Sequence, residues 1–143
     1  MTEENLQTIV RNCMRARLLD AQIVGENRIQ LPNTAFQKPT SGIWIRESVN
    51  EGKEEPASNA ATREFMVVNY EVFGKAAGGC AAVDATVAAI AREFRPVGRQ
   101  CEVYEQDGQA AYIRDIDKPA GGIDNGDPAW YRRLVAITLE LYI

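Results

Sequence analysis

Residues 62–94 read TREFMVVNYEVFGKAAGGCAAVDATVAAIAREF and place a strand-like segment, a glycine-rich turn and a helix-like segment in direct succession. Residues alternate in character along the first segment, and one set is wholly apolar: Met66, Val68, Tyr70 and Val72. The other set is mixed: Phe65, Val67, Asn69 and Glu71. This alternation predicts a long strand whose first face is buried in a core and whose second face contacts solvent or a partner.

The segment after the glycines has a helical period. Its large apolar residues recur at intervals of four, three and four positions: Val83, Val87, Ile90 and Phe94. Such a stripe predicts an amphipathic helix, and the alanines around it let the helix lie close to a sheet. Pro96 and Gly98 predict where this helix stops.

The glycine turn itself has only the outline of a phosphate-binding loop. A Walker loop needs its lysine after the last glycine, whereas Lys75 precedes Gly78 and Gly79 and Cys80 follows them. The dinucleotide spacing Gly-x-Gly-x-x-Gly is not met either. We therefore predict a structural turn, in which glycines provide positive φ angles and close packing of helix on sheet.

The remaining chain adds one helix and several strands. We predict a helix over 3–19 capped by Thr2 or Asn5, an extended piece at 28–31, a strand near 43–49 and an exposed loop over 50–61. A hairpin of 99–105 and 109–116, a loop over 117–129 and a final strand over 130–143 follow. The final strand has a predicted core face: Val135, Ile137, Leu139, Leu141 and Ile143. The whole predicts one domain, 1–143, of class α+β, with a mainly antiparallel sheet and two helices packed on one face.

Composition argues against several functional classes. The chain has no histidine, which removes Ser-His-Asp and Cys-His machinery, and its formal net charge of −4 disfavours a broad grip on nucleic acid. Three separated cysteines, Cys13, Cys80 and Cys101, favour small buried side chains over a zinc or redox site. Neither an apolar run of membrane-spanning length nor a secretory signal is present, so we expect synthesis and action in the cytosol. We predict no enzymatic activity and no cofactor.

Carboxylates in the 115–127 segment form the only metal-like pattern. Asp115, Asp117, Asp124 and Asp127 alternate with glycines, but the EF-hand order of ligands is not satisfied, so a solvated loop is favoured. Two other stretches, Trp44-Ile-Arg46 and Trp130-Tyr-Arg-Arg133, pair an aromatic ring with guanidinium groups. Base stacking is disfavoured without an RNP-type pattern, which leaves core or sheet-edge packing and, next, subunit contact.

The arrangement also resembles a known family. The stretch NTAFQKPTSGIWIRESVNEG (33–52) is followed by an arginine, the long strand, the glycine turn and an alanine-rich helix ending in Phe94. This order is similar to that of the small tail terminator proteins of long-tailed bacteriophages and prophages, also called tail completion or minor tail protein U-like proteins. Before the long strand the chain has Arg63 alone, where family members usually show a second arginine or a glycine.

The resemblance implies an α+β subunit that forms a ring, expected to be hexameric, capping the head-proximal end of the tail tube and docking the head. Its partners would be further copies of itself, the tail tube protein and a head-completion or neck protein, with DNA as passing cargo and no membrane. It would reside in the host cytoplasm during assembly and then in the virion tail. We predict that the 50–61 loop and a set of strand residues form the subunit interface: Trp44, Arg46, Phe65, Val67, Asn69, Trp130 and Arg132.

Two alternatives stay open. A head–tail connector or neck protein, or a tail tube subunit, would share a small α+β fold and ring symmetry. From a different class, a small ligand-binding domain or enzyme would use the Gly74–Gly79 loop.

Overall fold

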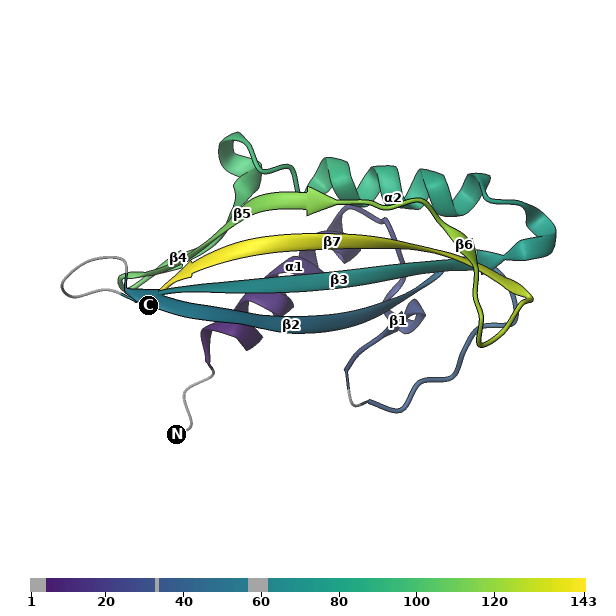
Figure 1. Cartoon of the computed structure of the whole chain (residues 1–143), viewed down its shortest axis with the longest axis horizontal. Helices are drawn as coiled ribbons and strands as arrows, with labels where there is room; N and C mark the ends of the chain where they lie inside the picture. The colour runs from purple at the N-terminus through teal and green to yellow at the C-terminus, as the bar shows by residue number, and fades with distance from the viewer. Residues whose placement is uncertain (1–4, 33, 57–61) are drawn as a thin grey trace.

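The computed structural model describes residues 5–32, 34–56 and 62–143, and within them the chain forms two α-helices and one curled sheet of seven strands (Figure 1). The helices are α1 (Leu6–Asp20) and α2 (Ala81–Glu93). The strands are β1 (Ile29–Gln30), β2 (Trp44–Pro56), β3 (Thr62–Lys75), β4 (Glu102–Gln106), β5 (Gln109–Asp117), β6 (Gly122–Ile123) and β7 (Trp130–Tyr142). The predicted α+β class is confirmed.

The sheet is built around the two longest central strands. Its order is β1-β2-β3-β7-β5-β4, with β6 paired to β7, and only the short β1–β2 pair is parallel. β3 and β7 pair without interruption from Arg63↔Tyr142 to Lys75↔Trp130. Strands so far apart in the chain meet because each has an apolar face that must be covered.

The inward side chains of these strands form the main core. The predicted faces of β3 and β7 are fully buried, with Met66, Val68, Tyr70 and Val72 in β3. They pack with the predicted stripe of Val83, Val87, Ile90 and Phe94, each at most 1% exposed, and with the buried residues of α1: Leu6, Val10, Met14 and Leu18. Ile143 is different: it follows the end of β7 and is 44% exposed, so its predicted place on the core face is wrong.

Helix α1 begins at Leu6, after Asn5, which is one of the two predicted caps, and not at residue 3 as predicted. The Asn5 side chain accepts a hydrogen bond from the backbone N–H of Thr8, which satisfies one of the free donors of the first turn. An ion pair joins the helix to the sheet, because Arg15 Nη2 lies 2.9 Å from an oxygen of Glu47, whose side chain is fully buried. Burial, and then the charge of Glu47, raise the pKa of Tyr70 far above its usual range.

The predicted exposed loop over 50–61 is wrong for its first part. β2 continues to Pro56, past a bulge between Glu51 and Glu54, and pairs with β3 as far as Pro56↔Thr62. The acidic composition of this stretch suggested a loop, but the long edge of β3 supplies pairing partners that composition does not reveal. Residues 57–61 lie outside the described part of the chain.

The glycine turn between β3 and α2 has the predicted structural role. A Cβ on Gly74 would stand 2.7 Å from Cγ2 of Val83 and 3.1 Å from Cδ1 of Ile43, so glycine permits the contact of helix and sheet. Gly79 has φ +80°, a conformation that a side chain disfavours. In the second hairpin, Asp107 and Gly108 both have positive φ, as a two-residue turn requires.

The cysteines are less buried than predicted. Cys80 is exposed at the start of α2, while Cys13 and Cys101 are half-buried. Partial burial raises the pKa of the Cys13 thiol. Cys80 occupies the turn before a helix, where the chain is at the surface, so apolar neighbours in sequence did not imply burial there.

Candidate interaction surface

All seven residues predicted to form a subunit interface lie on one face of the sheet, which we call the second face. They are Trp44 and Arg46 of β2, Phe65, Val67 and Asn69 of β3, and Trp130 and Arg132 of β7. The register establishes this, because Trp44 lies opposite Phe73 and Phe73 lies opposite Arg132, and every second residue follows on the same side. Their role in an interface stays a prediction.

Three aromatic rings form a separate small core at one end of the second face. Trp44 stacks on Phe73 at 4.1 Å between ring centroids, and Trp130 meets Trp44 edge-on at 6.0 Å. Trp44 and Trp130 are each only 2% exposed. Both tryptophans therefore serve packing within the subunit, and a partner could reach them only if their cover moved.

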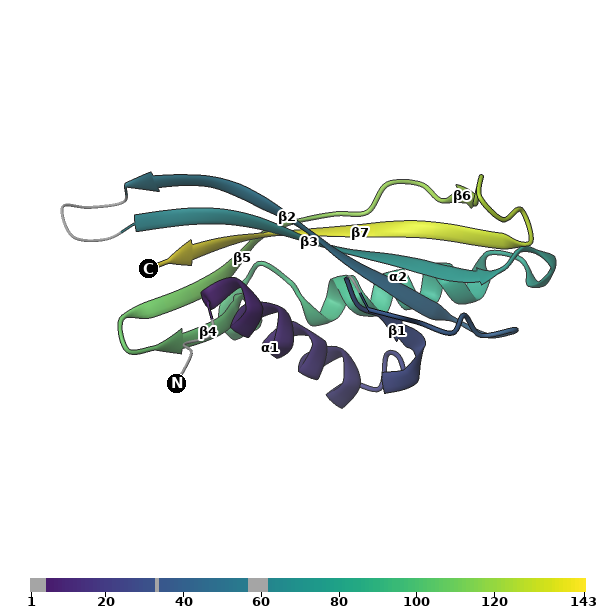
Figure 2. The same ribbon diagram turned by 90° about the horizontal axis from the view of Figure 1, so that it is seen from below.

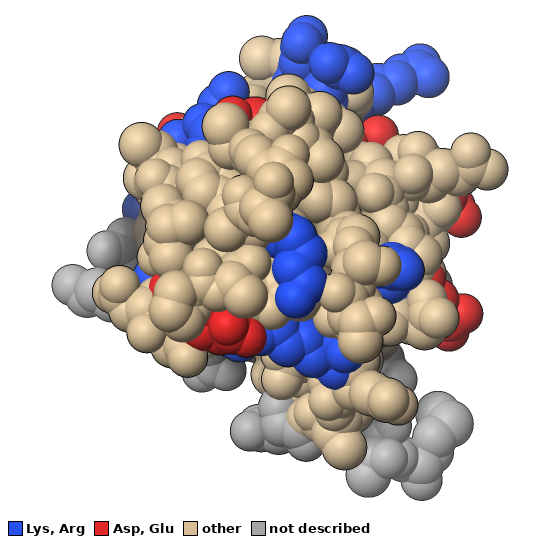
Figure 3. Space-filling model, turned by 90° about the vertical axis from the view of Figure 1, so that its right-hand side faces the viewer, with Lys and Arg blue, Asp and Glu red and all other residues tan. Residues whose placement is uncertain are grey.

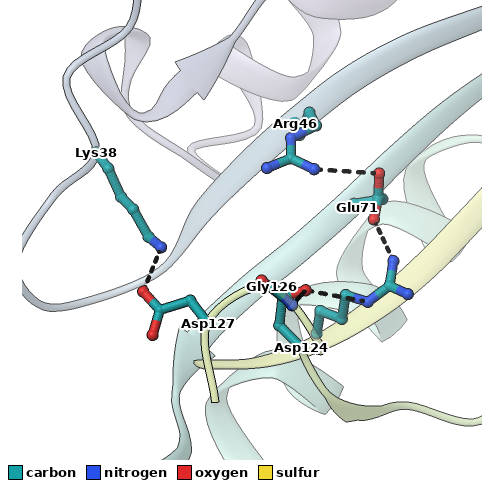
Figure 4. Close-up of polar contacts among 7 residues, drawn as sticks. Lys38, Arg46, Glu71, Asp124, Gly126 and Asp127 are labelled. Carbon is teal, nitrogen blue, oxygen red and sulfur yellow. Dashed lines mark hydrogen bonds and ion pairs between the residues drawn. The ribbon is translucent and has the colours of Figure 1, made fainter. Parts of the chain in front are cut away.

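That cover is a strap, residues 34–42, which has neither helix nor strand. Phe36 lies 5.4 Å from the Trp44 ring, and Lys38 Nζ lies 4.9 Å from the Trp130 ring. Lys38 also forms an ion pair of 2.9 Å with Asp127 (Figure 4). Hydrogen bonds from Lys38 and from the Ala129 backbone lower the pKa of Asp127.

Beside the aromatic rings, a row of charges crosses the three central strands. The carboxylate of Glu71 in β3 accepts a hydrogen bond of 2.6 Å from the guanidinium of Arg132 in β7. The same carboxylate lies 3.9 Å from the guanidinium of Arg46 in β2 (Figure 4). Arg132 also approaches Asp124 at 3.9 Å. The two arginine side chains remain about half exposed, at 44% and 45%, and so can meet a partner directly.

A second row of charges centres on Glu140, which is 8% exposed. Arg114 donates to Glu140 at 2.7 Å, Arg63 lies 3.4 Å away, and the hydroxyl of Tyr142 donates as well. Burial opposes ionisation of Glu140, but these hydrogen bonds and positive charges outweigh it, so its pKa is lowered. The hydrogen bond to Glu140 in turn raises the pKa of Arg114.

Between the two charged rows the second face carries small and neutral side chains. Asn69 lies opposite Ser48 and Ala136, and Val67 lies opposite Asn50 and Thr138. The middle of the second face thus carries uncharged side chains, and paired charges lie on either side of it. Such a surface is suited to close contact with another folded surface, where charges fix orientation more than they add affinity.

Sequence reasoning identified three strands of this surface but missed several of its members. Glu71 was placed on the mixed face of β3 but not listed among the interface residues, and Phe73 could have been found because it continues the same alternation. Glu140 could have been found in the same way, since it continues the alternation of Trp130 and Arg132 along the final strand. Lys38 had no such signal, because its partner Asp127 lies 89 residues away in the chain.

The other residues that could bind a metal ion or a ligand either have a structural role or do not come together in a site. Asp124 accepts the backbone N–H of Gly126, and Asp127 that of Ala129, so both carboxylates bind their own loop. Within the described residues, no three His, Cys, Asp or Glu side chains gather closely enough to hold a metal ion. The cavity beside the glycine turn measures about 190 Å³, below the range of about 300–1,000 Å³ typical of ligand pockets. Neither described helix combines the length and apolarity needed to cross a membrane.

Comparison with known proteins shows similarity in fold. No protein-family model matches this sequence, and no curated protein sequence does. One solved chain, whose printed name is a sequence identifier that gives no function, superposes with a TM-score of 0.68 at 16% identity, over 96% of each chain. A chain from the virion of a native gene transfer agent (GTA) particle superposes with a TM-score of 0.56 at 18% identity, over 96% of this chain and 95% of its own.

Proposed function

We propose that this protein is a structural subunit of a phage-like tail, a tail terminator whose copies form a ring at the head-proximal end of the tail tube. The ring, expected to be hexameric, stops polymerisation of the tube and offers a docking surface to a head-completion or neck protein. DNA passes through the ring as cargo. The subunit acts through its shape, in the host cytoplasm during assembly and then in the virion, without catalysis or a cofactor.

The observation that carries this proposal is the likeness in fold to a chain of a GTA virion over almost the full length of both chains. At 18% identity this likeness concerns the fold alone. The sequence resemblance to tail terminators in residues 33–52 and 61–94 supports the more specific role. The two lines of support are independent, since one comes from backbone geometry and the other from the order of motifs.

The second face of the sheet supports assembly by contact. We infer that α1 and α2 cover one face of the sheet and leave the second face to neighbouring subunits, as the view in Figure 2 suggests. Arg46 and Arg132 are half exposed beside the uncharged middle of the second face, and they would contact such neighbours first. The buried Trp44 and Trp130 would support the interface from beneath.

A tube-capping experiment tests this function and separates it from its neighbours. A purified phage tail tube protein from the same genome is polymerised with increasing amounts of the chain, and tube lengths and gold-labelled chain are scored by electron microscopy. A terminator shortens tubes and labels one end only. Label along the whole tube would indicate a tube subunit, and label on heads but not on tubes would indicate a connector. Unlabelled tubes of unchanged length, with an ATP- or NAD-dependent rise in melting temperature, would favour the ligand-binding alternative at Gly74–Gly79.

A further inference from the structure

A basic groove lies where the end of α2 meets the end of β5. It has a volume of about 420 Å³ and is lined by Arg92, Arg95 and Lys118, with Asp115 as its one carboxylate. Within the described residues, no ion pair joins these three cations to an acid, although most other arginines there are paired. Figure 3 shows Lys and Arg projecting at the top of the view, on the side where Figure 1 draws α2.

The groove also has apolar surface. Ala88, Ala91 and Ile116 contribute to its wall, and Pro96 leads to Val97, which is 59% exposed. Unpaired guanidinium groups next to exposed apolar side chains are typical of surfaces that bind another protein. The chain as a whole has a net charge of −4, so these unpaired cations form a positive region that is confined to the groove.

An acidic edge lies elsewhere on the same chain. Glu102 and Glu105 of β4 are exposed, and Asp107 occupies the adjacent turn. A hydrogen bond with Glu105, together with desolvation and the Glu105 charge, raises the pKa of Glu102, while Arg99 acts in the opposite direction. When both carboxylates are ionised their charges repel one another, and a cationic partner would relieve that repulsion.

Lys118, the only amine of the groove, lies too far along β5 from the acidic edge to meet it within one chain. Glu102 pairs with Tyr112 across the hairpin, whereas Lys118 follows Tyr112 by six residues. At about 3.3 Å per strand residue, this separates the two backbones by roughly 20 Å. Contact between two different patches on two copies is head-to-tail, the kind of contact that closes a ring.

From this charge complementarity we infer that the β4–β5 hairpin of one subunit docks on its neighbour, with Glu102 and Glu105 meeting Arg92, Arg95 and Lys118 of the groove. The inference rests on the proposed ring function and names a further inter-subunit contact, in addition to the one proposed for the second face. The exposed Val97 adds apolar area to the contact.

Carbodiimide coupling tests the contact directly, because it joins a lysine amine to a carboxylate only when the two touch. Natural and ¹⁵N-labelled chains are mixed in equal amounts at millimolar concentration, coupled, digested and read by mass spectrometry. We expect peptides that join Lys118 to Glu102 or Glu105 and carry one labelled and one unlabelled partner. Their absence, whether the chains associate by other surfaces or stay monomeric, overturns the inference.

Charge reversal provides the second test. R92E/R95E and E102R/E105R should each weaken self-association at least tenfold in sedimentation velocity, and an equal mixture of the two should restore it. E26K, a reversal at an exposed site in another part of the chain, is the matched control and should associate as the wild type does. Circular dichroism melting of each variant verifies that it folds.

The outcomes separate this contact from the proposed function. If wild-type chains cap tubes and both double variants also cap them, the contact is wrong and the terminator role stands. If the expected cross-links form but tubes are never capped, the contact stands and the terminator role fails. If R92E/R95E instead abolishes binding to fluorescent duplex DNA while association is unchanged, the groove serves DNA and the inference is wrong.

Discussion

At the scale of single residues, close packing and local charge determine which positions tolerate change. Gly74 is the clearest case, because its missing Cβ leaves room for Val83 of α2 and for Ile43. Gly78, four residues later, has nothing within 4 Å of the same position. The two glycines of one turn thus have different reasons for being there.

Gly74→Ala should destabilise the protein by about 1–3 kcal/mol, because the new methyl group forces Val83 or the helix to shift. Gly78→Ala is the matched control and should change the free energy of unfolding by less than about 1 kcal/mol. Urea denaturation of both variants measures the difference. Equal stabilities would contradict the close contact of α2 with β3.

Glu140 predicts a dependence of stability on pH. Its folded-state pKa is lowered, so its ionised form stabilises the fold above the unfolded-state pKa, and this contribution is lost as the pH falls through the folded-state pKa. Glu140→Gln should therefore be less stable than wild type at pH 7, and the difference should shrink in acid. Thermal melts from pH 7 to pH 3 measure it; a gap that is constant with pH would argue against the charge pair with Arg114.

At the scale of elements, both helices and the long strands β3 and β7 depend on one apolar face. Val87 lies in the middle of the α2 stripe and is 1% exposed against the sheet. We expect Val87→Asp to lower the free energy of unfolding by several kcal/mol, since an unpaired carboxylate would be buried. Ala85→Asp, on the exposed side of the same helix, is the control and should melt close to the wild type.

Substitutions at Trp44 and at the two exposed arginines of the second face distinguish an effect on folding from an effect on association. Trp44→Ala should cost about 3–5 kcal/mol of stability, because it leaves a cavity under the strap next to Phe73. Arg46→Ala and Arg132→Ala should each cost at most about 1 kcal/mol, as is usual for exposed ion pairs. Loss of tube capping in the arginine variants, with folding preserved by circular dichroism, would therefore assign the second face to the interface, whereas normal capping would remove it.

At the scale of the whole molecule, the described part of the chain leaves the groove cations Arg92, Arg95 and Lys118 without an ion pair and the carboxylates Glu102 and Glu105 exposed. We expect self-association to rise with concentration and to weaken between 0.1 M and 0.5 M salt, because exposed charges are screened over about a Debye length. Light scattering coupled to gel filtration measures both dependences. If self-association does not change with salt concentration, apolar contacts hold the copies together, and not the charges of Arg92 or Glu102.

Sequence reasoning succeeded where structure follows from neighbours along the chain. The Val83–Phe94 stripe predicted α2, the alternation of 62–74 predicted β3, and Gln106-Asp107-Gly108 predicted a hairpin turn, which the structure places at Asp107 and Gly108. It failed where a distant segment decides the outcome. β2 extends to Pro56 because β3 pairs with it, and Glu47 is buried because Arg15 of α1 reaches it.

The amino-acid sequence by itself determined the α+β class, the apolar stripe of α2 and the core faces of β3 and, as far as Leu141, of β7, because those depend on periods of 3.6 and 2 residues that can be read locally. Only the tertiary structure decided that Trp44 and Trp130 lie under a strap, that Glu71 and Glu140 each join arginines from different strands, and that Arg92, Arg95 and Lys118 share a groove. These features join residues far apart in the chain, and the free energy that brings them together comes from burying the whole core.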